Sequence, residues 1–507
     1  MNKLFHTSKV LFATLLLAMI MMTTSCSSEG DFYSKVPEDA RFVMSIKAKG
    51  LAEKSNAVKK MREIANFVGK QEAKDVADML ETLFGDESPV DLNNIVMFEY
   101  EGNVYAWLMV NDVEMLDKID AIAENFEKSK KDDFVIYEAN ENCCIVMNGN
   151  GGLMMMGNDA DSDDAIKAFM DFDDLESDKA IANNEIFMKN MQGDDDVYLY
   201  LDIEGLTSLV GSTAELKKAL SREFENEGLS VPDYIDEVME SFVYASASFT
   251  KDAATLKMSL LDDKGTNIIN KIYGNKTIDK KILSYLDKNS SFVMACSLPE
   301  QGKKMIEQAL SNSLPEEMKS TASEIVRHLD GNMAFGITVT DSIMAVKEKY
   351  DYWSDSYYTT TEPDFTRCGY TFVAKCNTKM DDYLSSLAGY LGMSATNGVI
   401  TIPNDEMNIT IKSDGDYVVV SNVGTPAQSL AGSDLANDKQ LLMYFDCSKN
   451  SSISSLINSE LPIDLDATTT LALDKECAML TIHVGNNKKD NILEYCFDLI
   501  IDIAKSK

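Results

Sequence analysis

The sequence predicts an α+β fold in two homologous modules, each an antiparallel sheet with helices packed on one face. Three observations support it. Strand patterns of five to eight residues lie close together, helical patterns interrupt them, and the same order of patterns occurs twice. Hairpins mixed with helices favour an antiparallel sheet, and a doubly wound parallel sheet is the alternative.

In the first module the strand patterns cover 42–46, 94–100, 104–110, 143–147, 152–156, 197–201, 242–249 and 256–261. The segment 148–151 (Asn-Gly-Asn-Gly) predicts a hairpin turn, because glycine and asparagine tolerate positive φ. Helical patterns cover 51–84 with a break, 113–126, 163–170, 182–191 and 207–224.

Five patterns of the first module return in the same order in the second. The matched pairs are 42–46 with 292–296, 104–109 with 369–374, 151–158 with 415–422, 197–202 with 441–446, and 249–252 with 473–476. Each match is short, but their shared order indicates an internal duplication. The two modules are therefore predicted at 32–275 and 276–507.

The N-terminus has the pattern of a secretory signal peptide. Lys3 and Lys9 precede the apolar run 10–22, and the small residues Thr23-Thr24-Ser25 lead to Cys26. Thirteen apolar residues rise about 20 Å as a helix, which is too short for the roughly 30 Å hydrocarbon core of a bilayer. Residues 1–25 are therefore predicted to be a cleaved signal peptide.

The residues around Cys26 resemble a bacterial lipoprotein box, with Thr23 where that family usually has leucine. The resemblance implies cleavage before Cys26 and attachment of acyl chains such as palmitate to it. Residues 26–31 resemble the acidic tether of Bacteroidetes surface lipoproteins, and Ser27 resembles the signal for outer-membrane sorting. The implied location is the outer membrane, facing the cell surface, with the periplasmic face as the alternative.

The opening Pro-Glu-Asp-Ala-Arg-Phe-Val-Met at 37–44 and the doubled module extend this resemblance over the mature chain. Together they resemble an uncharacterised Bacteroidetes outer-membrane lipoprotein family with a domain of unknown function. The resemblance implies location and architecture. It supplies no catalytic residues.

Composition narrows the function classes. A hydrophobic content of 45% with 26% charged residues is typical of a globular protein. The formal net charge of −36 repels nucleic acid phosphates, and no glycine-rich phosphate-binding motif is present, so neither nucleic acid nor nucleotide is an expected partner.

Catalytic and cofactor motifs are also missing from the sequence. After cleavage only His328 and His483 remain, which gives no basis for an imidazole-rich metal site or a recognisable Ser-His-Asp triad. The cysteines after Cys26 show no C-x-x-C spacing and mostly lie in apolar strand patterns, so they are predicted to be small buried residues. The sequence therefore predicts neither an enzymatic activity nor a bound cofactor.

The second module contains an aromatic insertion that is the first candidate site. Between 337 and 368 it carries Tyr350, Tyr352, Trp353, Tyr357 and Tyr358, where the first module has only the tight turn 101–103. Aromatic planes can stack on sugars or bind a partner protein, and long hairpins often carry function. The alternative is that these aromatics pack on a neighbouring sheet or helix.

An acidic segment is the second candidate. Asp159, Asp161 and Asp163 alternate as calcium ligands do, but Met170 occupies the position of the final acidic ligand of an EF-hand loop. The alternative is that these carboxylates occupy the first turn of a helix. A second acidic run, 194–196, is predicted to be a solvated turn before a strand.

The preferred function is a non-enzymatic, lipid-anchored envelope protein that binds a partner protein or belongs to an assembly at the outer membrane. Two large modules without recognisable chemistry, held at a membrane by lipid, favour it. The first alternative is glycan binding through the aromatic insertion. The second is a hydrolase that uses two carboxylates facing each other across a cleft.

Overall fold

The computed structural model describes residues 32–68, 71–85, 88, 90, 93, 95–112, 126–139, 143–149, 151–157, 160–205, 213–226, 231–232, 234–313, 316–339, 344–351, 355–364, 368–390, 392–394, 398–403, 408–426, 428–430, 434–448, 466–485 and 487–506. They form two compact units: Met1–Thr213, Met239–Thr266 and Asn487–Lys507 in the first, and Ala214–Val238 and Asn267–Asn486 in the second. Neither unit is continuous in sequence. The halves 32–275 and 276–507 were predicted from an internal duplication of the sequence, not from compactness. That duplication stays a prediction.

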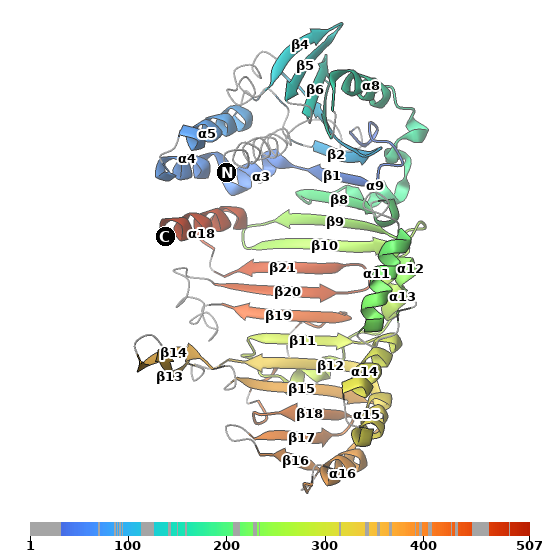
Figure 1. Cartoon of the computed structure of the whole chain (residues 1–507), viewed down its shortest axis with the longest axis vertical. Helices are drawn as coiled ribbons and strands as arrows, with labels where there is room; N and C mark the ends of the chain where they lie inside the picture. The colour runs from blue at the N-terminus through green and yellow to red at the C-terminus, as the bar shows by residue number, and fades with distance from the viewer. Residues whose placement is uncertain are drawn as a thin grey trace. The chain divides into compact units, whose positions relative to one another are not determined.

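The first unit contains one antiparallel sheet (Figure 1). Its strands lie in the order β4 (Glu127–Lys131), β5 (Phe134–Ala139), β6 (Cys143–Asn148), β7 (Gly151–Met156), β3 (Asn103–Met109), β2 (Ile95–Tyr100), β1 (Phe42–Ile46), β8 (Val197–Asp202), β9 (Phe242–Phe249) and β10 (Ala253–Leu261). Every neighbouring pair is antiparallel, which confirms the α+β class and makes the parallel alternative wrong.

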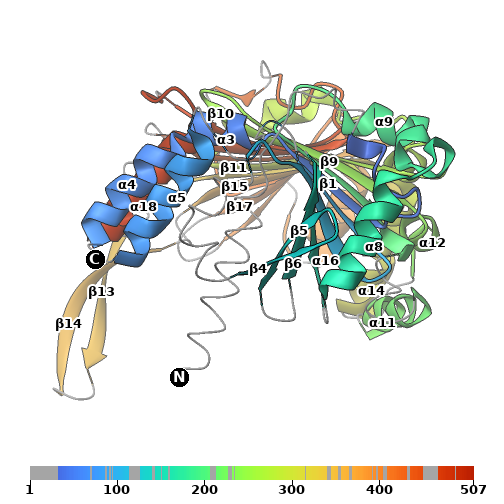
Figure 2. The same cartoon turned by 90° about the horizontal axis from the view of Figure 1, so that it is seen from above.

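Helices cover both faces of this sheet, not one as predicted. Val96 and Phe98 of β2 face a core that includes α8 (Ser162–Asp173) and α9 (Glu185–Met191). Ile95 and Met97 face a second core with α3 (Ala48–Ser55) and α5 (Gln71–Phe84) (Figure 2). The physical reason is that β2 is apolar at consecutive positions, so both of its faces must be buried.

The helices of the second core form a layer with the end of the chain. α3 ends at Asn56, whose left-handed φ of 54° separates it from α4 (Ala57–Val68). α18 (Ile492–Ser506) packs along α3 and α4. Its start is fixed to the β9–β10 turn, because the side-chain amide of Asn491 donates to the Phe249 carbonyl.

The second unit contains a sheet with the order β16 (Val399–Ile402), β17 (Ile409–Asp414), β18 (Tyr417–Ser421), β15 (Gly369–Cys376), β12 (Leu329–Thr338), β11 (Phe292–Ser297), β19 (Leu441–Cys447), β20 (Ala467–Leu473) and β21 (Ala478–Val484). One of its cores includes η4 (Lys280–Tyr285), and another includes α16 (Asp381–Tyr390). The remaining helices among the described residues are η2 (Ser177–Lys179), η3 (Ile181–Asn183), α11 (Thr213–Asn226), α12 (Ile235–Met239), α13 (Ile268–Tyr273), α14 (Glu300–Ser313) and α15 (Glu316–His328).

The two units connect equivalent strands in the same order. β1 lies between β2 and β8, and β11 lies between β12 and β19. The register agrees as well, because Phe42 is opposite Leu201 in the first unit and Phe292 is opposite Phe445 in the second. This is the arrangement that a duplication would produce. The duplication itself stays a prediction.

Candidate functional site

The aromatic insertion forms a β-hairpin that stands apart from the sheet of the second unit (Figure 1). β13 (Met344–Asp351) and β14 (Ser356–Pro363) pair only with each other among the described strands, with Tyr350 opposite Tyr357. The hairpin is inserted between β12 and β15. In the first unit the equivalent strands β2 and β3 are joined by Glu101-Gly102 alone, both with positive φ.

Most of the described side chains of this hairpin are exposed to solvent. Tyr357 is 72% exposed, Tyr358 is 50% exposed and Tyr350 is 38% exposed. These tyrosines therefore do not pack in a core, which was the alternative to a binding role. Tyr352 and Trp353 lie outside the described residues.

The acidic segment at the start of α8 has helix-capping contacts. The Asp161 carboxylate accepts a hydrogen bond from the Asp164 backbone N–H, and Asp163 forms an ion pair with Lys131. Asp159 lies outside the described residues. No group of three or more His, Cys, Asp or Glu side chains in the described part of the chain is placed to hold a metal ion.

The prediction of a solvated turn at 194–196 is wrong for Asp196. Its side chain is 4% exposed, forms an ion pair with Lys54, and accepts a hydrogen bond from the Phe249 backbone N–H. A carboxylate can be buried here because both of its oxygens have partners. Asp195 accepts a hydrogen bond from the Ser246 hydroxyl and forms an ion pair with Lys257, at 3.4 Å.

The cysteines of the described chain are free, and six of them are buried. Burial raises the pKa of the Cys143 and Cys144 thiols to about 12, with the Glu138 carboxylate adding to the effect at Cys144. Such thiols stay protonated at neutral pH and are poor nucleophiles. Cys26 lies outside the described residues.

None of the described helices is long and apolar enough to cross a bilayer.

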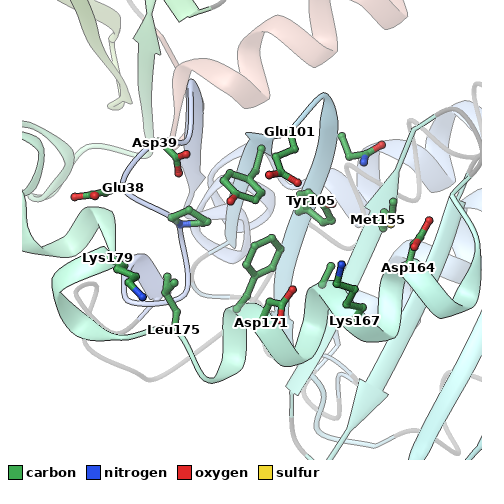
Figure 3. Close-up of a pocket in the computed structure, with 15 residues that line it drawn as sticks. Glu38, Asp39, Glu101, Tyr105, Met155, Asp164, Lys167, Asp171, Leu175 and Lys179 are labelled. Atoms are coloured by element: carbon green, nitrogen blue, oxygen red, sulfur yellow. The ribbon is translucent and has the colours of Figure 1, made fainter.

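The first unit contains a cavity of about 690 Å³ that sequence reasoning missed (Figure 3). Four parts of the chain form it: the segment before β1, the β2–β3 turn, β7, and α8 with the residues that follow it. The lining residues are Pro37, Glu38, Asp39, Tyr100, Glu101, Asn103, Tyr105, Met155, Asp164, Lys167, Ala168, Asp171, Phe172, Leu175 and Lys179.

Aromatic rings form one wall of this cavity. The buried Phe172 ring of α8 meets the rings of Tyr100 and Tyr105 edge-on, with centroid distances of 5.8 and 5.0 Å. Tyr105 stacks in turn on Phe98 in the core. This wall is rigid, because two paired strands and a packed helix hold its rings.

Carboxylates surround the same aromatic wall. Figure 3 shows Asp39 and Glu101 on one side of the cavity and Asp171 on the opposite side. Burial raises the pKa of the Tyr100 hydroxyl, and these three carboxylates raise it further. Burial likewise raises the pKa of Tyr105. The cavity therefore has negative potential next to an aromatic surface, a combination that favours cations.

Comparisons with known proteins give no family. No family model matches the sequence, and no curated protein matches it. Among solved structures, crystal form I of TP0453 is 10% identical, covers 51% of this chain and 84% of that chain, and has a TM-score of 0.26. Crystal form III of TP0453 is also 10% identical, covers 49% and 88% of the two chains, and has a TM-score of 0.28. These scores are too low to carry an argument.

Proposed function

We propose that this protein is a non-enzymatic, lipid-anchored envelope protein at the outer membrane that binds a partner protein through the β13–β14 hairpin. The observation that carries this proposal is that the hairpin forms a separate two-stranded sheet with exposed tyrosines. Exposed aromatic side chains on a projecting element are typical of binding surfaces, because they contribute large contact area with little loss of conformational entropy.

The backbone of the hairpin offers a second kind of contact. A strand at the edge of a sheet presents N–H and C=O groups to which an extended segment of a partner can pair. The exposed charges of Lys347, Glu348 and Lys349 on β13 oppose uncontrolled pairing between copies. A partner protein can therefore be selected by side chains while its backbone extends the sheet.

Glycan binding is the second candidate, because the same exposed tyrosines can stack on sugar rings. The geometry favours it less. The rings of Tyr350 and Tyr357 lie 5.0 Å apart but are inclined at 58°, so the two do not form one flat platform. The Tyr350 hydroxyl also donates to Asp355 across the hairpin end.

Removing the hairpin tests the proposed function. Replacing residues 340–367 by Asn-Gly keeps the buried Val339 and Cys368 and copies the two-residue turn between β2 and β3. We expect partner binding to be lost while the free energy of unfolding changes by less than about 1 kcal/mol, because the described hairpin side chains are exposed.

Binding is measured by photocrosslinking in whole cells, with a photoreactive residue at Tyr357. The control places the same residue at Met170, which is 52% exposed on α8. An adduct that forms only from position 357, and that excess purified wild-type protein suppresses, supports the proposal. If the hairpin-deleted protein suppresses the adduct equally well, the contact lies elsewhere. Glycan-array binding that depends on Tyr357 without a protein adduct would favour the second candidate.

The lipid anchor is tested separately with Cys26→Ala. We expect labelled palmitate to enter the wild-type protein and not the variant. The variant should leave the membrane fraction, because it lacks the acyl chains that stable attachment requires. Cys496→Ala is the matched control, since Cys496 is an exposed thiol in the mature chain. A Cys26→Ala protein that stays in the membrane fraction would contradict the anchor.

A further inference from the structure

The cavity of the first unit has features of a binding site that the hairpin does not explain. Its lining comes from segments distant in sequence, and it combines aromatic and apolar side chains with charged groups. Ligand sites are typically concave, with an apolar wall and a few convergent polar groups. All of its lining residues belong to the first unit, whereas the hairpin belongs to the second.

The charges of the lining residues indicate that the ligand is positively charged. Five carboxylates and two ammonium groups line the cavity. Lys179 already forms an ion pair, at 2.6 Å, with Glu176. Glu176 does not line the cavity. The carboxylates of Asp39, Glu101 and Asp171 come from three separate parts of the chain, and all three are close enough to Tyr100 to raise the pKa of its hydroxyl. A cation in the cavity would meet negative charge from both sides.

The spacing of the carboxylates indicates the size of that cation. No three acidic groups of the described residues are close enough to hold a metal ion, whereas the volume of about 690 Å³ accommodates an organic molecule. The rings of Tyr100 and Tyr105 and the side chains of Met155 and Leu175 offer apolar contact beside the carboxylates. An ammonium group on a hydrocarbon chain satisfies both requirements.

We propose that this cavity binds an organic cation, an alkylammonium group on a short hydrocarbon chain. The ammonium group lies between Glu101 and Asp171, next to the Tyr100 ring, and the chain lies against the aromatic wall. The same chemistry occurs in a free aliphatic amine and in the lysine side chain of a polypeptide. Two probes, one for each source, distinguish them.

The test uses the purified full chain in 150 mM salt, because a protein of net charge −36 attracts amines diffusely and salt screens this attraction. The probes are cadaverine for a free amine and Nα-acetyl-lysine N-methylamide for a lysine side chain. We expect saturable binding with a dissociation constant of about 1 mM or lower by calorimetry. The neutral probe 1-pentanol is expected not to bind.

The variant Glu101→Gln/Asp171→Asn removes two facing charges with little change in shape, and both side chains are exposed, so the fold should persist. We expect amine affinity to fall at least about tenfold. The matched control Asp174→Asn/Asp178→Asn removes the same charge from exposed positions outside the lining and should bind as wild type.

The relative affinities of the two amine probes identify the source of the cation, and saturable binding of either one supports the site. The proposed site is wrong if neither amine binds saturably at concentrations below about 10 mM, because a weaker affinity than this is negligible. Equal losses in the two double variants would show diffuse attraction instead of a site. Binding of 1-pentanol as tight as that of the amines would also exclude recognition of the ammonium group.

Discussion

Replacing Glu494 with glutamine and Asp498 with asparagine together is expected to lower the free energy of unfolding of the first unit by about 3–5 kcal/mol. Both carboxylates are on α18 and pair with Lys60 of α4, at 3.6 and 2.5 Å. The Lys60 side chain is only 4% exposed. In the double variant its ammonium group keeps Glu63 alone, at 3.9 Å, as a charged partner. The large cost arises because a buried charge loses its main counterions.

A third substitution separates charge from packing. Lys60→Met in the double variant removes the unpaired charge and retains most of the side-chain volume, so we expect it to restore most of the lost stability. Chemical denaturation measures all variants. Glu63→Gln alone is the control, because Glu63 is 43% exposed, and it should cost at most about 0.5 kcal/mol. If the triple variant is no more stable than the double variant, the unpaired ammonium is not the cause.

The same network predicts a dependence on pH. Burial raises the pKa of Asp498, but hydrogen bonds from Lys489 and Lys60 outweigh burial and hold it below its usual range. A carboxylate with a depressed pKa contributes stability above its unfolded pKa, about 3.9, and this contribution is lost as the pH falls toward the folded value. The stability difference between the wild type and the double variant should therefore shrink below about pH 4.

Strands with apolar periodicity were predictable from sequence, and polar ones were not. β9 is found at the predicted residues 242–249, and β6, β7 and β8 differ from their predicted bounds by at most one residue at an end. β4 was missed, because its residues Glu-Lys-Ser-Lys-Lys are all exposed and show no alternation. Its pairing with β5 creates the strand, and that is a tertiary contact.

One of the two candidate sites was likewise predictable from the sequence, and the other was not. The hairpin was predictable, because an aromatic insertion appears when the two predicted halves of the sequence are compared. The cavity was not, since Asp39, Glu101 and Asp171 are far apart in sequence and each resembles an ordinary surface acid. Lys60 was equally hidden, because a lysine in an amphipathic helix normally faces solvent.

The two candidate sites occupy equivalent positions in the two units. In the first unit the β2–β3 turn supplies Glu101 to the cavity. In the second unit the connection between the equivalent strands β12 and β15 carries the β13–β14 hairpin. Connections between strands tolerate insertion, because they lie at the surface and few core contacts depend on them. A duplicated module could therefore acquire different binding elements at one turn without altering its core.

Phe172→Ala is expected to lower the free energy of unfolding of the first unit by about 3–5 kcal/mol. The Phe172 side chain is 3% exposed and meets the rings of Phe98, Tyr100 and Tyr105 at centroid distances of 5.1, 5.8 and 5.0 Å. All three contacts are edge-to-face, and each adds about 0.5–1.5 kcal/mol beyond simple burial. Paired strands fix the three partner rings, so the space left by the substitution cannot close.

Met170→Ala provides the matched control on the same helix, because Met170 is 52% exposed and its truncation should change stability by no more than about 0.5 kcal/mol. Guanidinium unfolding, with an unchanged dependence on denaturant concentration, measures both variants. A loss below about 1 kcal/mol for Phe172→Ala would mean that α8 moves inward to fill the space. In that case the aromatic wall would be too pliable to keep the cavity open, and Phe172→Leu would be indistinguishable from the wild type.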